Sequence, residues 1–172
     1  MAIAISSERR RHFHPQPKGV WVEVPCFFMA LIGLLEDNDR IAKLCATFLH
    51  FAGHQVTIYD NSLNCLHALF SQRRSQENLL STLETAGLSS LPVEVLILDL
   101  SLPDINGIEV LRCLTSHPHT QSLPLIVCTA ATGADIARAR QVAPHVSIIE
   151  KPFKFQTLVA AISSALETTT AQ

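Results

Sequence analysis

Along this chain, short runs of apolar residues alternate with longer segments in which apolar residues recur at helical spacing. Short apolar runs rich in Val, Ile and Leu predict strands, and the longest of them is bounded by Pro92 and Pro103. Apolar residues at helical spacing predict the helices between them. The expected strands cover residues 28–35, 55–59, 93–99, 123–128 and 146–149, and the expected helices cover residues 40–51, 62–70, 106–116, 134–142 and 155–166. This alternation predicts an α/β fold, with a parallel sheet of five strands and helices on both of its faces.

Local signals place the ends of the first helices. Asn38 or Asp39 is suited to cap the helix that follows the first strand, and Gly53 is suited to end it. The run Asp60-Asn61-Ser62 opens the second helix in the same way. Each helix therefore begins directly after the carboxyl end of a predicted strand.

Two segments do not continue the pattern. Residues 1–28 are basic and Pro-containing at first, and we expect a flexible extension with a possible short strand at residues 20–24. Residues 71–91 are polar and predict an insertion with a short helix at 76–86, either tolerated at the surface or docking a partner. The expected domain covers residues 29–167, and residues 168–172 form a tail.

Two other interpretations of the N-terminal segment are open. Met29 could be the natural start, which would make residues 1–28 dispensable. The run Arg10-Arg11-His12-Phe13 before an apolar stretch has some likeness to a twin-arginine export signal. That interpretation is disfavoured because Glu23 and Pro25 interrupt the stretch, which is too short to span a bilayer.

Composition narrows the class of protein. Hydrophobic residues make up 48% and charged residues 16% of the 172 positions, which is typical of a globular domain with a large core. The formal net charge of -2 gives no reason to expect direct contact with nucleic acid. Five cysteines without a C-x-x-C pair suggest reduced, buried thiols in the cytoplasm rather than disulfides or a zinc site.

Polar side chains stand where four of the predicted strands end. They are Glu36 and Asp37 after the first, Asp99 at the third, Thr129 at the fourth and Lys151 after the fifth. Parallel strands end at one edge of the sheet, so these groups should converge there. Crowded carboxylates repel, and Mg²⁺, which prefers oxygen ligands, would relieve that repulsion. Such a site is suited to receiving a phosphoryl group, with the carboxylate of Asp99 as the attacking group.

Four motifs stand at these strand ends. They are Leu34-Leu35-Glu36-Asp37-Asn38, the run from Leu96 to Gly107, Ile126-Val127-Cys128-Thr129-Ala130 and Ile149-Glu150-Lys151-Pro152-Phe153. Over roughly residues 30–166 they resemble the receiver domain of two-component response regulators, the CheY-like family. The spacing from Asp99 to Thr129 and to Lys151 also fits that family, and residues 71–91 explain the longer spacing from Asp37. The resemblance implies a doubly wound, flavodoxin-like sheet with strand order 2-1-3-4-5.

The resemblance also implies a role for each residue of the site. Asp99 would be the nucleophile that accepts phosphate from the phosphohistidine of a sensor histidine kinase or a phosphotransfer protein. Mg²⁺ would be held by Asp37 and Asp99 directly, by Glu36 through water and by the backbone carbonyl of Ser101. Thr129 would hydrogen-bond a phosphoryl oxygen, Lys151 would pair with Asp99 or the phosphate, small Ala130 would leave room, and Lys151–Pro152 would be cis.

The chain departs from the family at the position three residues before the lysine, where Ile148 replaces the usual aromatic residue; Leu102 replaces a usual Met. A haloacid dehalogenase-type phosphatase is set aside, because Ser101 stands where that class needs a second Asp. A receiver-fold interaction module that acts without phosphorylation remains the alternative. We expect a cytoplasmic phosphoacceptor without small-molecule turnover or a membrane span, which signals through a downstream effector protein.

Overall fold

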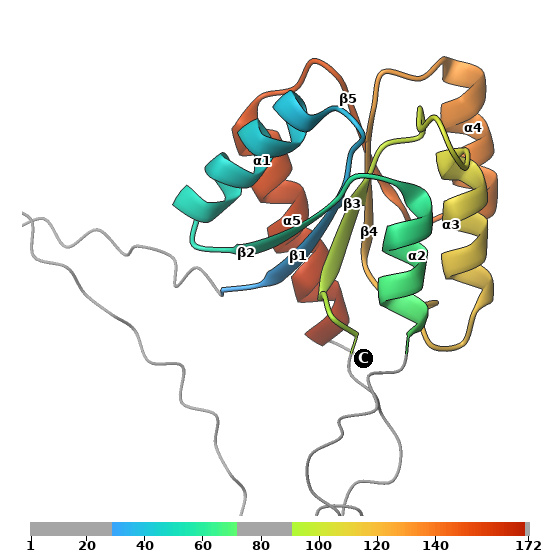
Figure 1. Cartoon of the computed structure of the whole chain (residues 1–172), viewed down its shortest axis with the longest axis horizontal. Helices are drawn as coiled ribbons and strands as arrows, with labels where there is room; N and C mark the ends of the chain where they lie inside the picture. Colours follow the sequence, from blue (N-terminus) through green and yellow to red (C-terminus); the bar gives the residue numbers. More distant parts are fainter. Residues whose placement is uncertain (1–28, 72–90, 171–172) are drawn as a thin grey trace, which may run out of the picture.

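The computed structural model describes residues 29–71 and 91–170, which form ten helices and strands (Figure 1). In chain order these elements are β1 (Leu31–Leu35), α1 (Asp39–Phe51), β2 (Gln55–Tyr59), α2 (Ser62–Phe70), β3 (Val95–Leu98), α3 (Gly107–Ser116), β4 (Leu125–Thr129), α4 (Gly133–Val142), β5 (Ser147–Glu150) and α5 (Phe155–Thr170).

The five strands form one parallel sheet in the order β2-β1-β3-β4-β5. Helices α1 and α5 cover one face of this sheet, and α2, α3 and α4 cover the other, as Figure 1 shows. The α/β class, the parallel pairing and the strand order predicted from the sequence are therefore confirmed.

The alternation of side chains along β3 explains why a continuous apolar run is needed at the centre. Every residue of β3 is buried. Val95 and Ile97 pack in the core beneath α1 and α5, whereas Leu96 and Leu98 pack in the core beneath α2, α3 and α4. Because successive residues of a strand point to opposite faces, a strand covered on both sides carries no polar position until it ends.

Caps at the helix starts match the local signals in the sequence. The side chain of Asn38 accepts hydrogen bonds from the backbone N–H groups of Arg40 and Ile41, which caps α1. Asn61 caps α2 in the same manner through the N–H of Asn64. After α1 the chain turns at Gly53, whose φ of 88° lies in the left-handed region that glycine adopts without strain.

Several predicted boundaries were wrong. Strand β1 begins at Leu31 rather than at residue 28, and β3 ends at Leu98, so Asp99 is the first residue beyond it. Helix α5 continues to Thr170 instead of ending at residue 166, and within it the hydroxyl of Thr168 donates to the carbonyl of Ser164. Threonine is a poor helix former, which explains the early end inferred from sequence. The predictions for residues 1–28 and for residues 72–90 of the insertion concern segments outside the described residues.

Cysteine burial was predicted only in part. The cysteines of the described ranges are free thiols, with Cys65 and Cys128 buried and Cys45 half-buried. Cys113 is exposed, contrary to the prediction, because it lies on the side of α3 opposite the buried residues Leu111 and Leu114. In the part of the chain that the structure describes, the helices are all too short or too polar to cross a membrane.

Candidate functional site

The carboxyl ends of four neighbouring strands bring a small set of polar side chains together. Glu36 follows β1, Asp99 follows β3, Thr129 ends β4 and Lys151 follows β5. The backbone hydrogen bonding of the sheet extends to these residues: the N–H of Asp99 donates to the carbonyl of Leu35, and the N–H of Lys151 donates to the carbonyl of Thr129. The sheet thus fixes where each side chain starts.

Asp99 is held at both of its carboxylate oxygens. Its Oδ1 accepts a hydrogen bond from the hydroxyl of Thr129 at 2.8 Å and another from the backbone N–H of Ser101 at 3.0 Å. Its Oδ2 accepts from the ammonium group of Lys151 at 2.8 Å. Only 7% of the residue is exposed, so the carboxylate is both oriented and largely withdrawn from water.

Lys151 bridges two carboxylates. Besides Asp99, its Nζ donates to Oε2 of Glu36 at 2.6 Å. The side chains of Lys151, Glu36 and Asp99 are 16%, 6% and 9% exposed. Charges withdrawn from water to this degree are stable only when they are paired. The ion pair to Glu36, which joins residues 115 positions apart, was not predicted from the sequence.

These contacts decide how the two central groups ionise. Burial raises the pKa of Asp99, but hydrogen bonds from Lys151, Ser101 and Thr129 together hold it below its ordinary value of 3.8. Burial lowers the pKa of Lys151, but hydrogen bonds to Asp99 and Glu36 raise it above its ordinary value of 10.5. At neutral pH the site therefore contains an ionised carboxylate beside an ammonium.

A glycine lets the start of α3 pack directly on the backbone that carries Asp99. The N–H of Gly107 donates to the carbonyl of Leu100 at 3.0 Å. A Cβ at Gly107 would lie 2.5 Å from the Cα of Leu100 and closer still to the carbonyl oxygen of Asp99. Since real Cβ atoms do not approach backbone so closely, any other residue at this position would displace either α3 or the loop after β3.

Asp104 ties the same loop to the start of α2, which the sequence did not reveal. Its Oδ2 accepts from the backbone N–H groups of Ser62 at 2.8 Å and Leu63 at 3.3 Å, and its Oδ1 accepts from the buried hydroxyl of Ser62. Burial raises the pKa of Asp104, but these hydrogen bonds and one from the N–H of Ile105 outweigh burial and hold the pKa below its ordinary value. A carboxylate at a helix N-terminus is a common stabilising contact.

The remaining residues singled out in the sequence lie around this centre without joining it. Asp37 is exposed, and within the described ranges its side chain has no hydrogen bond or ion pair to the other residues of the site. Ala130 is exposed next to Thr129, and Ile148 is half-buried against the core beneath α2, α3 and α4. The Lys151–Pro152 peptide bond is cis, as expected.

The donor set fits a hard cation, although the carboxylates are not gathered into a ligand cluster. Among the described residues, no group of three His, Cys, Asp or Glu side chains is placed to hold a metal ion. Here Lys151 already bridges two of the carboxylates. The side chains of Glu36, Asp37 and Asp99 nonetheless offer only oxygen atoms, and one ammonium does not balance three carboxylates. Such a set is suited to Mg²⁺.

Comparison with known proteins gives a consistent result. A family model described as "Response regulator receiver domain" matches residues 32–163. The phosphate regulon transcriptional regulatory protein PhoB of Rhizobium meliloti is 38% identical over 136 residues, which are 78% of this chain and 51% of that protein. The uncharacterized transcriptional regulatory protein YkoG of Bacillus subtilis is 29% identical over 140 residues, 77% of this chain and 49% of that protein. The chain spans about half the length of these curated relatives.

Solved structures agree on the fold. A response regulator receiver domain protein from Clostridium thermocellum superposes with a TM-score of 0.65 at 20% identity, covering 83% of this chain and 98% of the other. A CheY-like receiver domain protein from Methanospirillum hungatei gives a TM-score of 0.64 at 18% identity, with coverages of 83% and 98%. At these identities the likeness shows the arrangement of strands and helices alone.

Proposed function

Because this chain belongs to the response regulator receiver domain family, we propose that it accepts a phosphoryl group on Asp99. The observation that carries the proposal is the carboxylate of Asp99 held between the hydroxyl of Thr129 and the ammonium of Lys151. A receiver domain is a signalling module rather than an enzyme that turns over small molecules, and we assign this chain the same role.

Each of these side chains has a defined task in the proposed transfer. A carboxylate oxygen of Asp99 attacks the phosphorus of a phosphohistidine, the new O–P bond forms as the P–N bond breaks, and the imidazole nitrogen keeps the bonding electrons. The ammonium of Lys151 lies where negative charge gathers on the transferred oxygens, and the hydroxyl of Thr129 can donate to one of them. The low pKa of Asp99 keeps the nucleophile ionised.

Receiver domains of this family generally use Mg²⁺, and the oxygen donors present here support the same for this chain. Asp37, Asp99 and the backbone carbonyl of Ser101 would hold the ion, with Glu36 contributing through water. When bound, Mg²⁺ neutralises charge on the phosphoryl oxygens. Asp37 is the exposed carboxylate of this set, which leaves it accessible to an incoming ion.

The partners follow from this role. The phosphoryl donor would be a sensor histidine kinase or a phosphotransfer protein, and the output would pass to a downstream effector protein in the cytoplasm. The curated relatives are named as transcriptional regulators, but the chain spans only about half of their length. We propose no direct contact between this chain and nucleic acid, in keeping with its formal net charge of -2.

The test is covalent modification measured by intact mass. After incubation with acetyl phosphate and Mg²⁺, the chain should gain the mass of one phosphoryl group, and removal of Mg²⁺ with a chelator should prevent the gain. Asp99→Asn should abolish it. Asp60→Asn is the matched control, because Asp60 is an exposed aspartate that follows β2 at the same edge of the sheet, and this variant should still be modified.

An unchanged mass in the wild-type chain would overturn the proposal. That result would favour an interaction module that keeps the fold and acts without phosphorylation. Ile148 is the observation behind this second candidate, because a half-buried aliphatic residue already packed on the core has no ring to move between exposed and buried positions.

A further inference from the structure

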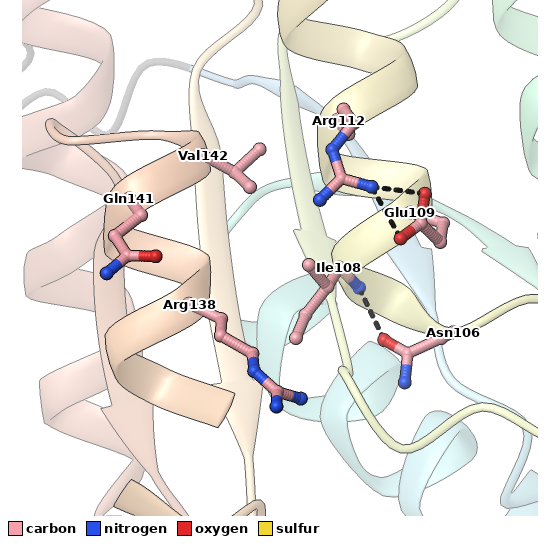
Figure 2. A pocket seen from close by; sticks show the side chains of 7 residues that line it. All are labelled: Asn106, Ile108, Glu109, Arg112, Arg138, Gln141 and Val142. Carbon is pink, nitrogen blue, oxygen red and sulfur yellow. Dashed lines mark hydrogen bonds and ion pairs between the residues drawn. The ribbon is translucent and has the colours of Figure 1, made fainter. Parts of the chain in front are cut away.

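A groove between α3 and α4 lies apart from the carboxylate of Asp99. It is half open to solvent and has a volume of about 340 Å³, near the lower end of the range for sites that bind small ligands. Its residues come from the first turns of α3 and the second half of α4. They are Asn106, Ile108, Glu109, Arg112, Arg138, Gln141 and Val142 (Figure 2).

The two arginines of the groove are held very differently. Arg112 donates to both carboxylate oxygens of Glu109, at 2.5 Å each, so these two opposite charges cancel within α3. Among the described residues, Arg138 has only a long ion pair of 3.6 Å to Asp135, and its side chain is 69% exposed. That distance is too long for a strong hydrogen bond. The guanidinium of Arg138 thus keeps donors for another acceptor.

Apolar and amide groups surround that guanidinium. Figure 2 shows Arg138 extending from α4 toward Ile108 and Asn106 on α3, with Val142 also directed into the groove. Ile108 is buried and belongs to the core beneath α3, and Val142 packs against the same core. The Oδ1 atom of Asn106 accepts from the N–H of Ile108, so the amide NH₂ of Asn106 is the part that can donate.

We propose that this groove binds a small organic anion, namely a carboxylate attached to a short planar or branched apolar group. The planar guanidinium of Arg138 matches a carboxylate through two parallel hydrogen bonds. The apolar part of the ligand would contact Ile108 and Val142. Arg112 is already satisfied by Glu109, whereas the 3.6 Å contact to Asp135 leaves the guanidinium of Arg138 open to a second, closer carboxylate, which favours an anion over a cation or a neutral ligand.

The inference does not depend on the proposed phosphoacceptor role, because binding is measured on the unmodified chain. Benzoate is the probe, and its neutral isostere benzamide is the ligand control. In a two-dimensional NMR titration, benzoate should shift the backbone amides of Ile108, Arg138 and Val142 along saturable curves. Benzamide should bind at least tenfold more weakly, since it lacks the charge that Arg138 recognises.

A pair of variants on α4 separates recognition from general charge attraction. Arg138→Gln should weaken the apparent Kd for benzoate about tenfold. Arg140→Gln removes the same charge from the same helix at an exposed position outside the groove, and should leave the Kd within about twofold. Shifts that do not saturate, equal binding of benzamide, or equal losses in the two variants would each overturn the proposal.

Discussion

Replacing Gly107 with alanine tests whether the close packing of α3 on the loop after β3 holds Asp99 in place. A Cβ at this position would meet the backbone of Asp99 and Leu100, which cannot rotate away as a flexible side chain could. Either α3 must move outward or the loop must shift. Forcing one extra carbon into a packed site of this kind costs about 1–3 kcal/mol.

The chain offers a matched control in Gly133. Gly107 and Gly133 are each the first residue of a helix, so the effect of alanine on helix propensity and on the unfolded chain is similar at both. A Cβ at Gly133, however, has no atom within 4 Å. Gly133→Ala should therefore stabilise the protein by about 0.5 kcal/mol, whereas Gly107→Ala should destabilise it by about 1–3 kcal/mol.

Urea denaturation followed by circular dichroism measures the difference. With a denaturant slope of about 2 kcal/mol/M, Gly107→Ala should lower the urea midpoint by roughly 1 M, and Gly133→Ala should raise it slightly. The backbone that the new Cβ would meet belongs to Asp99 and Leu100. Modification by acetyl phosphate should therefore slow about tenfold or more in Gly107→Ala. Equal midpoints in the two variants would refute the steric reasoning.

Two further predictions concern the charged centre. Lys151→Met should destabilise the fold by about 3 kcal/mol at neutral pH, because it leaves the buried carboxylates of Glu36 and Asp99 without their cation. In the double variant Lys151→Met with Glu36→Gln, which removes one of these carboxylates, the urea midpoint should lie between those of Lys151→Met and wild type. An unaltered midpoint in Lys151→Met would contradict a stabilising role for the ion pairs. Because the folded-state pKa of Asp99 lies below 3.8, its contribution to stability is complete above that pH and is lost as the pH falls through the folded-state value. Urea midpoints below about pH 4 should therefore fall less steeply in Asp99→Asn than in wild type, and parallel slopes would speak against the depressed pKa.

The grouping of polar residues at the strand ends could be predicted, because in a parallel sheet the residues that follow each strand have little freedom in where they lie. Once apolar runs alternate with helical segments, the residues that follow each run must lie at one edge. Glu36, Asp99, Thr129 and Lys151 were placed together on that ground, and the structure has them in direct contact. Asp37 shows the limit of this reasoning, since its neighbour Glu36 turns inward while Asp37 itself is exposed.

Contacts between side chains of different loops could not be predicted in the same way. Periodicity shows which face of a helix is buried, but it does not show which atom meets which across a loop. The bonds from Ser62 to Asp104 depend on how the loop after β3 folds over the start of α2. The groove beside Arg138 likewise depends on how far α4 stands from α3, which two separately amphipathic patterns do not specify.

Thr129 connects the carboxylate of Asp99 to the beginning of α4. Its hydroxyl donates to Asp99 and also accepts from the backbone N–H of Ala131 at 3.1 Å, one residue before the Thr132 cap of α4. A phosphoryl group on Asp99 would compete for that hydroxyl and would draw Lys151 away from Glu36. Helix α4 has a single buried residue, Ala139, fewer than any other described helix, so it is the helix least restrained by the core. In a chain with Ile148 in place of an aromatic residue, the loop from Thr129 to α4 therefore remains as a physical connection between the state of Asp99 and the surface.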